Sequence, residues 1–118
     1  MKKLAVMFVL LLVGCVDLGR IGTHPDMKQV YLKGYPHNVA DCLFAAAQSQ
    51  HLRLERDGRL TQGIEKYNLT DRNYDNVAWI EIAAAGRQQS SVTFYYAKEP
   101  DVSAAVSAMA ARCKDSRF

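Results

Sequence analysis

The chemistry available to this chain rests on few side chains: three cysteines, three histidines and one acid inside an apolar stretch. His24, His37 and His51 stand apart, and none belongs to a recognisable motif with Ser, Cys or Asp that would form a nucleophilic site. Glu81 lies near Trp79 in a strongly apolar segment. The sequence has no phosphate-binding loop, no dinucleotide fingerprint and no metal-ligand spacing. It therefore predicts a protein that is not an enzyme and uses neither cofactor nor metal.

The first residues have the organisation of a signal peptide. Met-Lys-Lys at positions 1–3 gives a basic start, and residues 4–13 are an unbroken apolar run of ten residues. This run is too short for a stable helix across a bilayer core of about 30 Å. It ends in Leu-Val-Gly-Cys at positions 12–15, with small or aliphatic residues before the cysteine. The segment resembles the lipobox of bacterial lipoproteins, over about the first 16 residues.

By that resemblance, residues 1–14 are a cleaved signal peptide and Cys15 is the lipidated first residue of the mature chain. It would carry a diacylglyceryl thioether, with a third acyl chain such as palmitate on its amine in Gram-negative species. In enteric-type sorting, Asp directly after the cysteine retains a lipoprotein in the inner membrane. Here Val16 takes that place and Asp17 comes one position later, which implies the outer membrane, on its periplasmic face. An uncleaved anchor or a buried N-terminal helix is the other interpretation of this run.

The charge balance argues against a nucleic-acid partner. The chain carries 15 Lys and Arg against 12 Asp and Glu, a formal net charge of +3, and two of these lysines lie in the predicted signal peptide. Removal of residues 1–14 leaves a mature chain of 104 of the 118 residues. The loss of the two lysines lowers its formal net charge to +1. No Lys/Arg cluster remains that would indicate nucleic acid or an anionic lipid surface. The remaining length suits one domain with a modest core.

The two other cysteines form an even pair once Cys15 is assigned to the lipid. An exported domain meets an oxidising compartment, which predicts a disulfide between Cys42 and Cys113. Two free buried thiols are the alternative. Each cysteine lies on the apolar stripe of a predicted helix. The first stripe is Val39, Cys42, Leu43, Ala46 and Ala47; the second is Val102, Ala105, Val106, Met109, Ala110 and Cys113.

Helix and strand signals predict the order of the elements. A helix opens at Pro36, with Asn38 as its cap, and ends near Gln50, and a second helix opens at Pro100. Alternating apolar residues predict strands at 28–33, 51–56, 59–70, 77–85 and 91–97. The resulting order of strand, helix, four strands and helix predicts an α+β fold. In it, two helices pack on one face of a mainly antiparallel sheet.

Turn signals predict how the strands connect. Asp57-Gly58 predicts a tight hairpin turn, a phase change in the following strand predicts a bulge near Gly63, and residues 71–76 have loop chemistry. Residues 15–27 are interpreted as the lipidated cysteine and a tether, and residues 28–118 as a single domain.

The last hairpin predicts the candidate binding face. One register makes a wholly apolar face by pairing Ile80 with Tyr96, Ile82 with Phe94 and Ala84 with Val92. The opposite face then carries Trp79, Glu81, Thr93 and Tyr95. Trp and Tyr are enriched at protein interfaces, which predicts that this face binds a partner. In the alternatives, the loop at 71–76 shields Trp79 for the core, and Glu81 is an ordinary solvated charge.

These observations predict a lipid-anchored cell-envelope lipoprotein that acts as a non-catalytic binding or accessory module. Its partners would be the membrane, through the lipid, and an envelope protein. The alternative is a periplasmic inhibitor or immunity lipoprotein that blocks an enzyme. Such an inhibitor would insert a loop into an active site, and the loops at 71–76 and 86–90 would serve.

Overall fold

The computed structural model describes residues 21–22, 24–59 and 63–114. The predicted signal peptide and Cys15 lie outside these residues. Within them, five strands and two helices follow one another in the predicted order. They are β1 (Asp26–Lys33), α2 (Pro36–Ser49), β2 (Arg53–Arg59), β3 (Glu65–Thr70), β4 (Asn76–Ala84), β5 (Gln89–Tyr96) and α3 (Pro100–Arg112).

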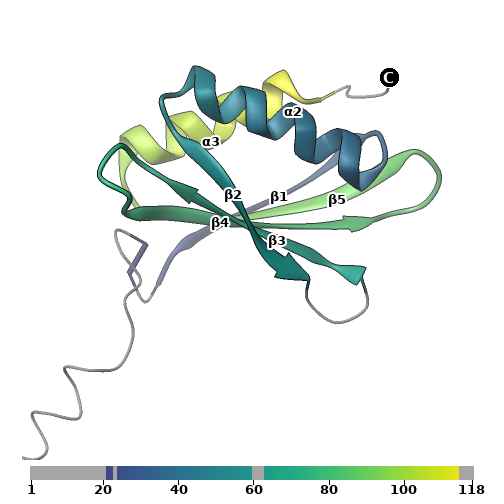
Figure 1. Ribbon diagram of the computed structural model, residues 1–118, viewed down its shortest axis with the longest axis horizontal. Helices are drawn as coiled ribbons and strands as arrows, with labels where there is room; N and C mark the ends of the chain where they lie inside the picture. Colours follow the sequence, from purple (N-terminus) through teal and green to yellow (C-terminus); the bar gives the residue numbers. More distant parts are fainter. Residues whose placement is uncertain (1–20, 23, 60–62, 115–118) are drawn as a thin grey trace, which may run out of the picture.

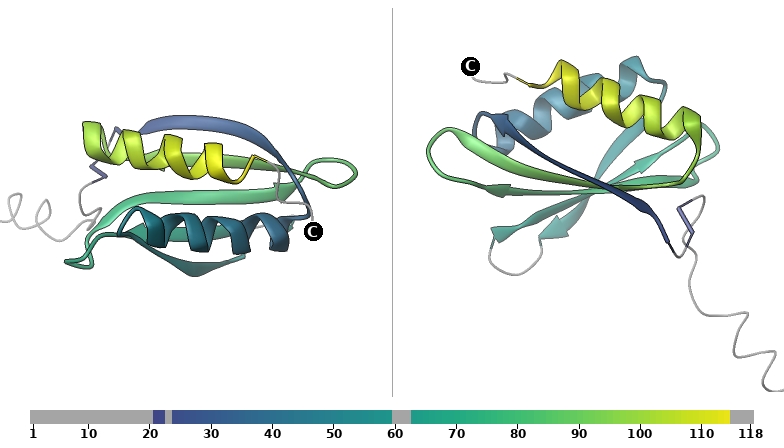
Figure 2. Two further views of the ribbon diagram at one scale, coloured as in Figure 1. Left: turned by 90° about the horizontal axis from the view of Figure 1, so that it is seen from above. Right: turned by 180° about the vertical axis from the view of Figure 1, so that it is seen from behind.

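The strands form one antiparallel sheet with the order β1-β5-β4-β3-β2. The first two strands of the chain lie at opposite edges of this sheet, because α2 carries the chain across it. Figure 1 shows the sheet edge-on with both helices above it, and Figure 2 shows the helices side by side. The predicted α+β class, with two helices on one face of an antiparallel sheet, is confirmed.

The core lies between the sheet and the helices. Its fully buried side chains include Val39 and Leu43 from α2, Ile80 and Ile82 from β4, Val92 and Phe94 from β5, and Val106 and Met109 from α3. Burying one such side chain stabilises the fold by about 1.5–3 kcal/mol. Turning β4 and β5 over would expose the four core side chains that these two strands contribute. Burial alone therefore decides which face of these strands meets the helices.

The β4–β5 register differs by two residues from the predicted one. The observed pairs are Ile80 with Phe94, Ile82 with Val92 and Ala84 with Ser90, so the predicted pairs of Ile80 with Tyr96, Ile82 with Phe94 and Ala84 with Val92 are wrong. The reason lies in the turn, where the Ala85 N–H donates to the Gln89 carbonyl oxygen at 2.9 Å and closes a shorter loop. Because side chains alternate between faces, a shift of two leaves every residue on its predicted face.

The predicted hairpin turn at Asp57-Gly58 is also wrong. Both residues lie inside β2, where the pairing with β3 shifts between Arg56 and Gly58. Asp57 is therefore the extra residue of a β-bulge, and Gly58 has φ +147°, which favours glycine. A backbone of this kind suits a bulge as well as a turn. The bulge expected near Gly63 is likewise wrong, since Gly63 lies in the connection between the two strands.

The element boundaries differ from the predictions at several ends. Tyr35 is the N-cap of α2 and makes no side-chain cap bond, so Asn38 is not the cap. Pro36 occupies the first turn, where the missing N–H costs no helical hydrogen bond. Strand β1 begins at Asp26, two residues earlier than predicted, and β2 begins at Arg53, two residues later.

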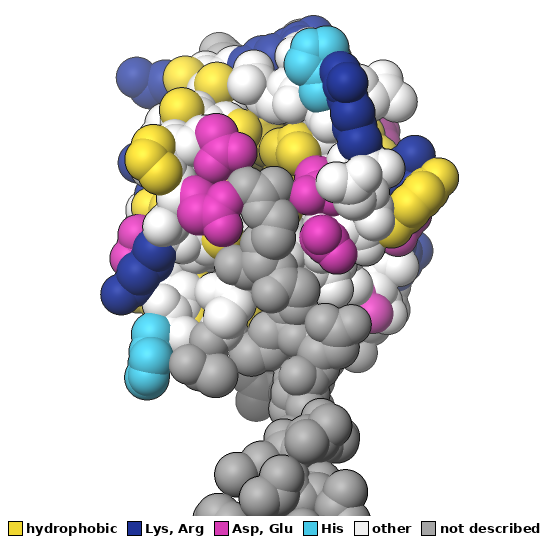
Figure 3. Space-filling view, turned by 90° about the vertical axis from the view of Figure 1, so that its left-hand side faces the viewer, with side chains coloured by type: hydrophobic (Ala, Val, Ile, Leu, Met, Phe, Trp, Pro, Cys, Tyr) yellow, Lys and Arg dark blue, Asp and Glu magenta, His cyan; other side chains and the backbone are white. Residues whose placement is uncertain are grey.

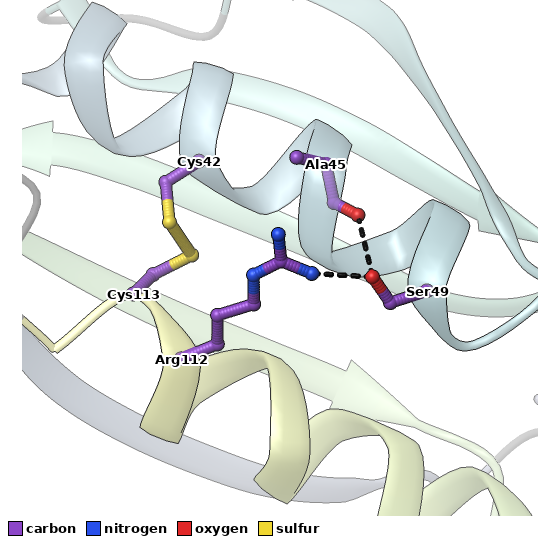
Figure 4. Close-up of a disulfide and its surroundings, with 5 residues drawn as sticks. All are labelled: Cys42, Ala45, Ser49, Arg112 and Cys113. Carbon is purple, nitrogen blue, oxygen red and sulfur yellow. Dashed lines mark hydrogen bonds between the residues drawn. A yellow bond between two sulfur atoms is a disulfide. The ribbon is translucent and has the colours of Figure 1, made fainter.

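The predicted disulfide is present in the structure. Cys42 on α2 and Cys113 at the C-terminal end of α3 are bonded, with their Cα atoms 5.8 Å apart (Figure 4). Beside this bond, Arg112 donates a hydrogen bond to the Ser49 hydroxyl, which itself donates to the Ala45 carbonyl oxygen at 3.3 Å. The middle of α2 is thus bonded covalently to the C-terminal end of α3, and an exposed polar contact joins the C-terminal ends of the two helices.

Candidate functional site

The candidate site lies on the face of the sheet opposite the helices. In the part of the chain that the structure describes, this face carries no helix (Figures 1 and 2). The four predicted residues meet at its centre as two neighbouring cross-strand pairs, Trp79 with Tyr95 and Glu81 with Thr93. We call these four side chains the central cluster. Sequence alternation alone therefore located the cluster, even though the register that produced it was wrong.

The aromatic pair has a defined geometry. The rings of Trp79 and Tyr95 stack with their centroids 4.8 Å apart and their planes 18° apart. The Nζ of Lys66 on β3 lies 5.4 Å from the centroid of the Trp79 ring. Since Lys66 and Tyr95 belong to strands on either side of β4, the indole has a neighbour on each side. Its edge, and not an open ring face, is what a ligand would meet.

The electrostatic setting keeps Tyr95 neutral. Partial burial, and then the nearby Glu81 carboxylate, raise the pKa of the Tyr95 hydroxyl. Both effects disfavour the phenolate, so Tyr95 serves at ordinary pH as a hydrogen-bond donor and acceptor. Glu81 also lies opposite Lys66 in the β3–β4 register. The cluster thus combines apolar area with a hydroxyl and a carboxylate, and Lys66 beside it carries the opposite charge.

Two residues of β1 extend this face toward the sheet edge. Met27 pairs with Tyr95 and Tyr31 pairs with Ser91, and their side chains are 61% and 59% exposed. Sequence reasoning missed both residues, because Met27 was assigned to the tether and Tyr31, inside the predicted strand at 28–33, was not singled out. The alternation of β1 was a usable signal, but only the topology shows that β1 lies beside β5.

The loop between β3 and β4 does not place its aromatic side chain over Trp79. Asp71 Oδ1 accepts hydrogen bonds from the backbone N–H groups of Asn73 and Asp75, at 2.8 and 3.0 Å. Tyr74, at φ +64°, is 68% exposed, and the Arg53 guanidinium carbon lies 4.4 Å from the centroid of its ring. The loop therefore presents a separate aromatic surface, supported by β2.

Other chemistry-bearing groups do not converge. His24, His37 and His51 are all exposed and lie in different segments. Acidic side chains gather at the end of the molecule shown in Figure 3. The strand register places the start of β1, the β3–β4 loop and the start of α3 at one end of the sheet, and these segments carry Asp26, Asp71, Asp75, Glu99 and Asp101. Among the described residues, no group of three or more His, Cys, Asp or Glu is placed to hold a metal ion.

Comparisons with known proteins assign no family: no family model, no curated protein and no solved structure matches this chain. Within the described ranges, no helix is long and apolar enough to cross a membrane.

Proposed function

We propose that this protein is a lipid-anchored envelope lipoprotein that acts as a non-catalytic binding module, and that the central cluster binds a partner protein of the envelope. The observation that carries the proposal is the stacked pair of Trp79 and Tyr95 on a sheet face that no helix of the described residues covers. Trp79 and Tyr95 are half-buried, and apolar side chains left partly open to solvent on an uncovered sheet face are typical of interaction surfaces. Trp and Tyr are also the side chains that most often dominate binding energy at such surfaces.

The geometry favours a protein partner over a flat ligand. With Tyr95 and Lys66 on its two sides, Trp79 offers the edge of its ring and no open ring face. Thr93 and Glu81 supply hydroxyl and carboxylate groups beside it. An apolar centre with hydrogen-bonding neighbours is the usual composition of a protein–protein interface.

Anchoring is supported by sequence alone. The lipobox-like segment ends at Cys15, and Val16 follows it, which favours the periplasmic face of the outer membrane. A tether between Cys15 and Asp26 would let the folded domain reach a partner near the membrane surface.

The deciding experiment is Trp79→Ala, with partner capture from envelope extracts and denaturant unfolding measured on the same protein. We expect capture to fall strongly, because the cluster loses its largest apolar side chain. The stability loss should stay below the 3–5 kcal/mol typical of truncating a buried aromatic, since an aromatic stack contributes about 0.5–1.5 kcal/mol beyond its burial.

Ile80→Ala is the matched control, because Ile80 is the next residue of β4 and points into the core. It should lower stability by about 2–5 kcal/mol and leave capture by the folded fraction unchanged. If Trp79→Ala instead behaves like Ile80→Ala, Trp79 belongs to the core and the proposed binding face is wrong.

The inhibitor function remains the second candidate, and one observation favours it. Tyr74 is presented at 68% exposure on a loop held by Asp71, as a side chain that enters an active site would be. Tyr74→Ala separates the two functions. A loss of capture in this variant, with normal capture by Trp79→Ala, would favour an inhibitor that uses the loop.

A further inference from the structure

Among the described residues, strand β1 forms one edge of the sheet. The Ala85–Gln89 hydrogen bond shows that the odd-numbered residues of β5 bond to β4, so its even-numbered residues bond to β1. In the β1–β5 register these partners are the even-numbered residues of β1. The backbone groups of Met27, Gln29, Tyr31 and Lys33 therefore point away from the sheet.

One of these positions is already occupied. The Lys33 N–H donates to the Lys114 carbonyl oxygen at 3.5 Å, so the C-terminal end of α3 closes this end of the edge. Met27, Gln29 and Tyr31 remain, and the described part of the chain supplies no backbone partner on their outer side. Unpaired edge groups of this kind are a template for another strand.

On both faces of the sheet, the surface beside β1 has room for the side chains of an added strand. On the open face, Met27 and Tyr31 are among the most exposed large apolar side chains of the described residues. On the helix side, a groove of about 340 Å³ runs between β1 and α3. Its lining includes Lys28, Val30, Leu32, Ala110, Ala111 and Lys114.

We propose that the occupant of this edge is a second copy of the chain, bound by antiparallel β1–β1 pairing about a twofold axis through Gln29. The three free positions are symmetric about Gln29, so this register uses all of them. Gln29 faces Gln29 of the second copy, and Met27 faces Tyr31 of the second copy on both sides of the axis. Each of these pairs exchanges two N–H···O bonds.

The side chains are complementary in this register. Met27 lies against Tyr31 of the second copy, a favourable contact between a thioether and an aromatic ring. Asp26 lies opposite Leu32 of the second copy, on the helix side of the sheet and near Lys114 of that copy, so opposite charges meet at both ends. The two Lys28 side chains are diagonal neighbours at about 7–8 Å between backbones, where salt screens much of their repulsion.

This interface goes beyond the proposed function and uses different residues. The two sheets become one continuous sheet, and the central clusters of both copies stay uncovered on the same face. Two lipid anchors per assembly would strengthen membrane attachment by avidity.

The test is the oligomeric state of the full chain in detergent, measured by sedimentation over a range of concentrations, for Gln29→Pro against Gln29→Ala. Because the Gln29 N–H points outward, proline removes no β1–β5 hydrogen bond and is tolerated at an edge. Alanine loses only the side-chain bond to Ser91 Oγ, 3.2 Å long. We expect a concentration-dependent dimer that Gln29→Pro weakens at least about tenfold and Gln29→Ala leaves nearly unchanged.

Oxidative cross-linking tests the register without depending on the proline variant. Gln29→Cys should cross-link to itself, since Cα atoms in such a pair are about 5.5 Å apart, within disulfide range. Tyr31→Cys should cross-link only when mixed with Met27→Cys. A monomer at every concentration, or a dimer that keeps its strength in Gln29→Pro, overturns the proposal. A dimer abolished by Trp79→Ala would overturn it too, by placing self-association on the central cluster.

Discussion

At the scale of single residues, Tyr67 is the group whose chemistry the fold changes most. Its side chain is 4% exposed, and its hydroxyl donates to Glu65 Oε1 at 2.7 Å. Burial first, and then this hydrogen bond to Glu65, raise the pKa of Tyr67 from 10.0 to about 12. Because the folded state disfavours the phenolate, Tyr67 resists ionisation until the protein unfolds or the pH is very high.

The raised pKa of Tyr67 predicts an alkaline loss of stability. The stabilisation is complete below the unfolded pKa of about 10 and disappears as the pH rises through about 12, because the unfolded state then releases the proton first. Tyr67→Phe removes this dependence. We expect the denaturant midpoint of the unmodified protein to fall more steeply between these pH values than that of the variant. If the denaturant midpoints of the two proteins fall in parallel as the pH rises, the raised pKa of Tyr67 is not the cause of the alkaline loss of stability.

Neighbouring residues of β4 show how alternation assigns roles. Ile80 is fully buried under the helices, whereas Trp79 is half-buried on the other face and stacked on Tyr95. The two residues have similar apolar character in the sequence. Because successive side chains of a strand point to opposite faces, only the position along β4 separates the core residue from the candidate binding residue.

At the scale of elements, the disulfide joins the two helices. Cys42 and Cys113 are 71 residues apart, and the bond ties the first helix of the domain to its last. The contact of Arg112 with Ser49 lies nearby but is exposed (Figure 4). In the chain-entropy model, a loop of this length makes the disulfide worth about 4 kcal/mol, against about 1 kcal/mol or less for one exposed polar contact.

This difference predicts a hierarchy between two variants. Replacing both Cys42 and Cys113 by Ala should lower the free energy of unfolding by about 4 kcal/mol, whereas Arg112→Ala should lower it by less than about 1 kcal/mol. Denaturant unfolding measures both. Reduction should also raise the intact mass by about two hydrogens. Free alkylation of both thiols in the unreduced protein would show that the bond is absent.

The β2 bulge shows that an Asp-Gly pair is compatible with two different backbone structures. Asp-Gly indicates a hairpin turn because glycine accepts positive φ, but the same property accommodates a bulged strand. Here the Asp57 carboxylate lies 3.5 Å from Lys66 Nζ across the strand pair. The pairing of Gly58 with Lys66 brings these two charges onto neighbouring strands, and only the tertiary structure shows that pairing.

At the scale of the whole molecule, the start of the described domain and the central cluster lie on different parts of the fold. The chain enters the sheet at the N-terminal end of β1, at the edge of the sheet, while the central cluster lies on β4 and β5. A lipid on Cys15 would therefore hold the domain without occupying the cluster.

Lipidation predicts a defined phenotype for Cys15→Ser. Without the thiol no thioether forms, so the precursor should accumulate with its signal peptide uncleaved and a correspondingly higher mass. Membrane fractionation and intact-mass measurement test both points. Normal cleavage of the variant would refute the lipobox interpretation, and Cys42→Ala serves as the control that alters a cysteine elsewhere.

The sequence by itself determined the elements, the fold class, the cysteine pair and the face on which Trp79 and Tyr95 lie. The cysteine pair follows from the even count that is left once Cys15 is assigned to the lipid. The other features follow from the periodicity of apolar residues, because burying the wrong face of one strand would cost several core side chains at about 1.5–3 kcal/mol each. Only the tertiary structure decided the β4–β5 register, the bulge at Asp57 and the place of β1 beside β5. A two-residue shift keeps the same faces buried, so the pattern of apolar residues does not predict the β4–β5 register. The strand that lies beside β1 depends on the path of the whole chain, so local patterns do not predict it either.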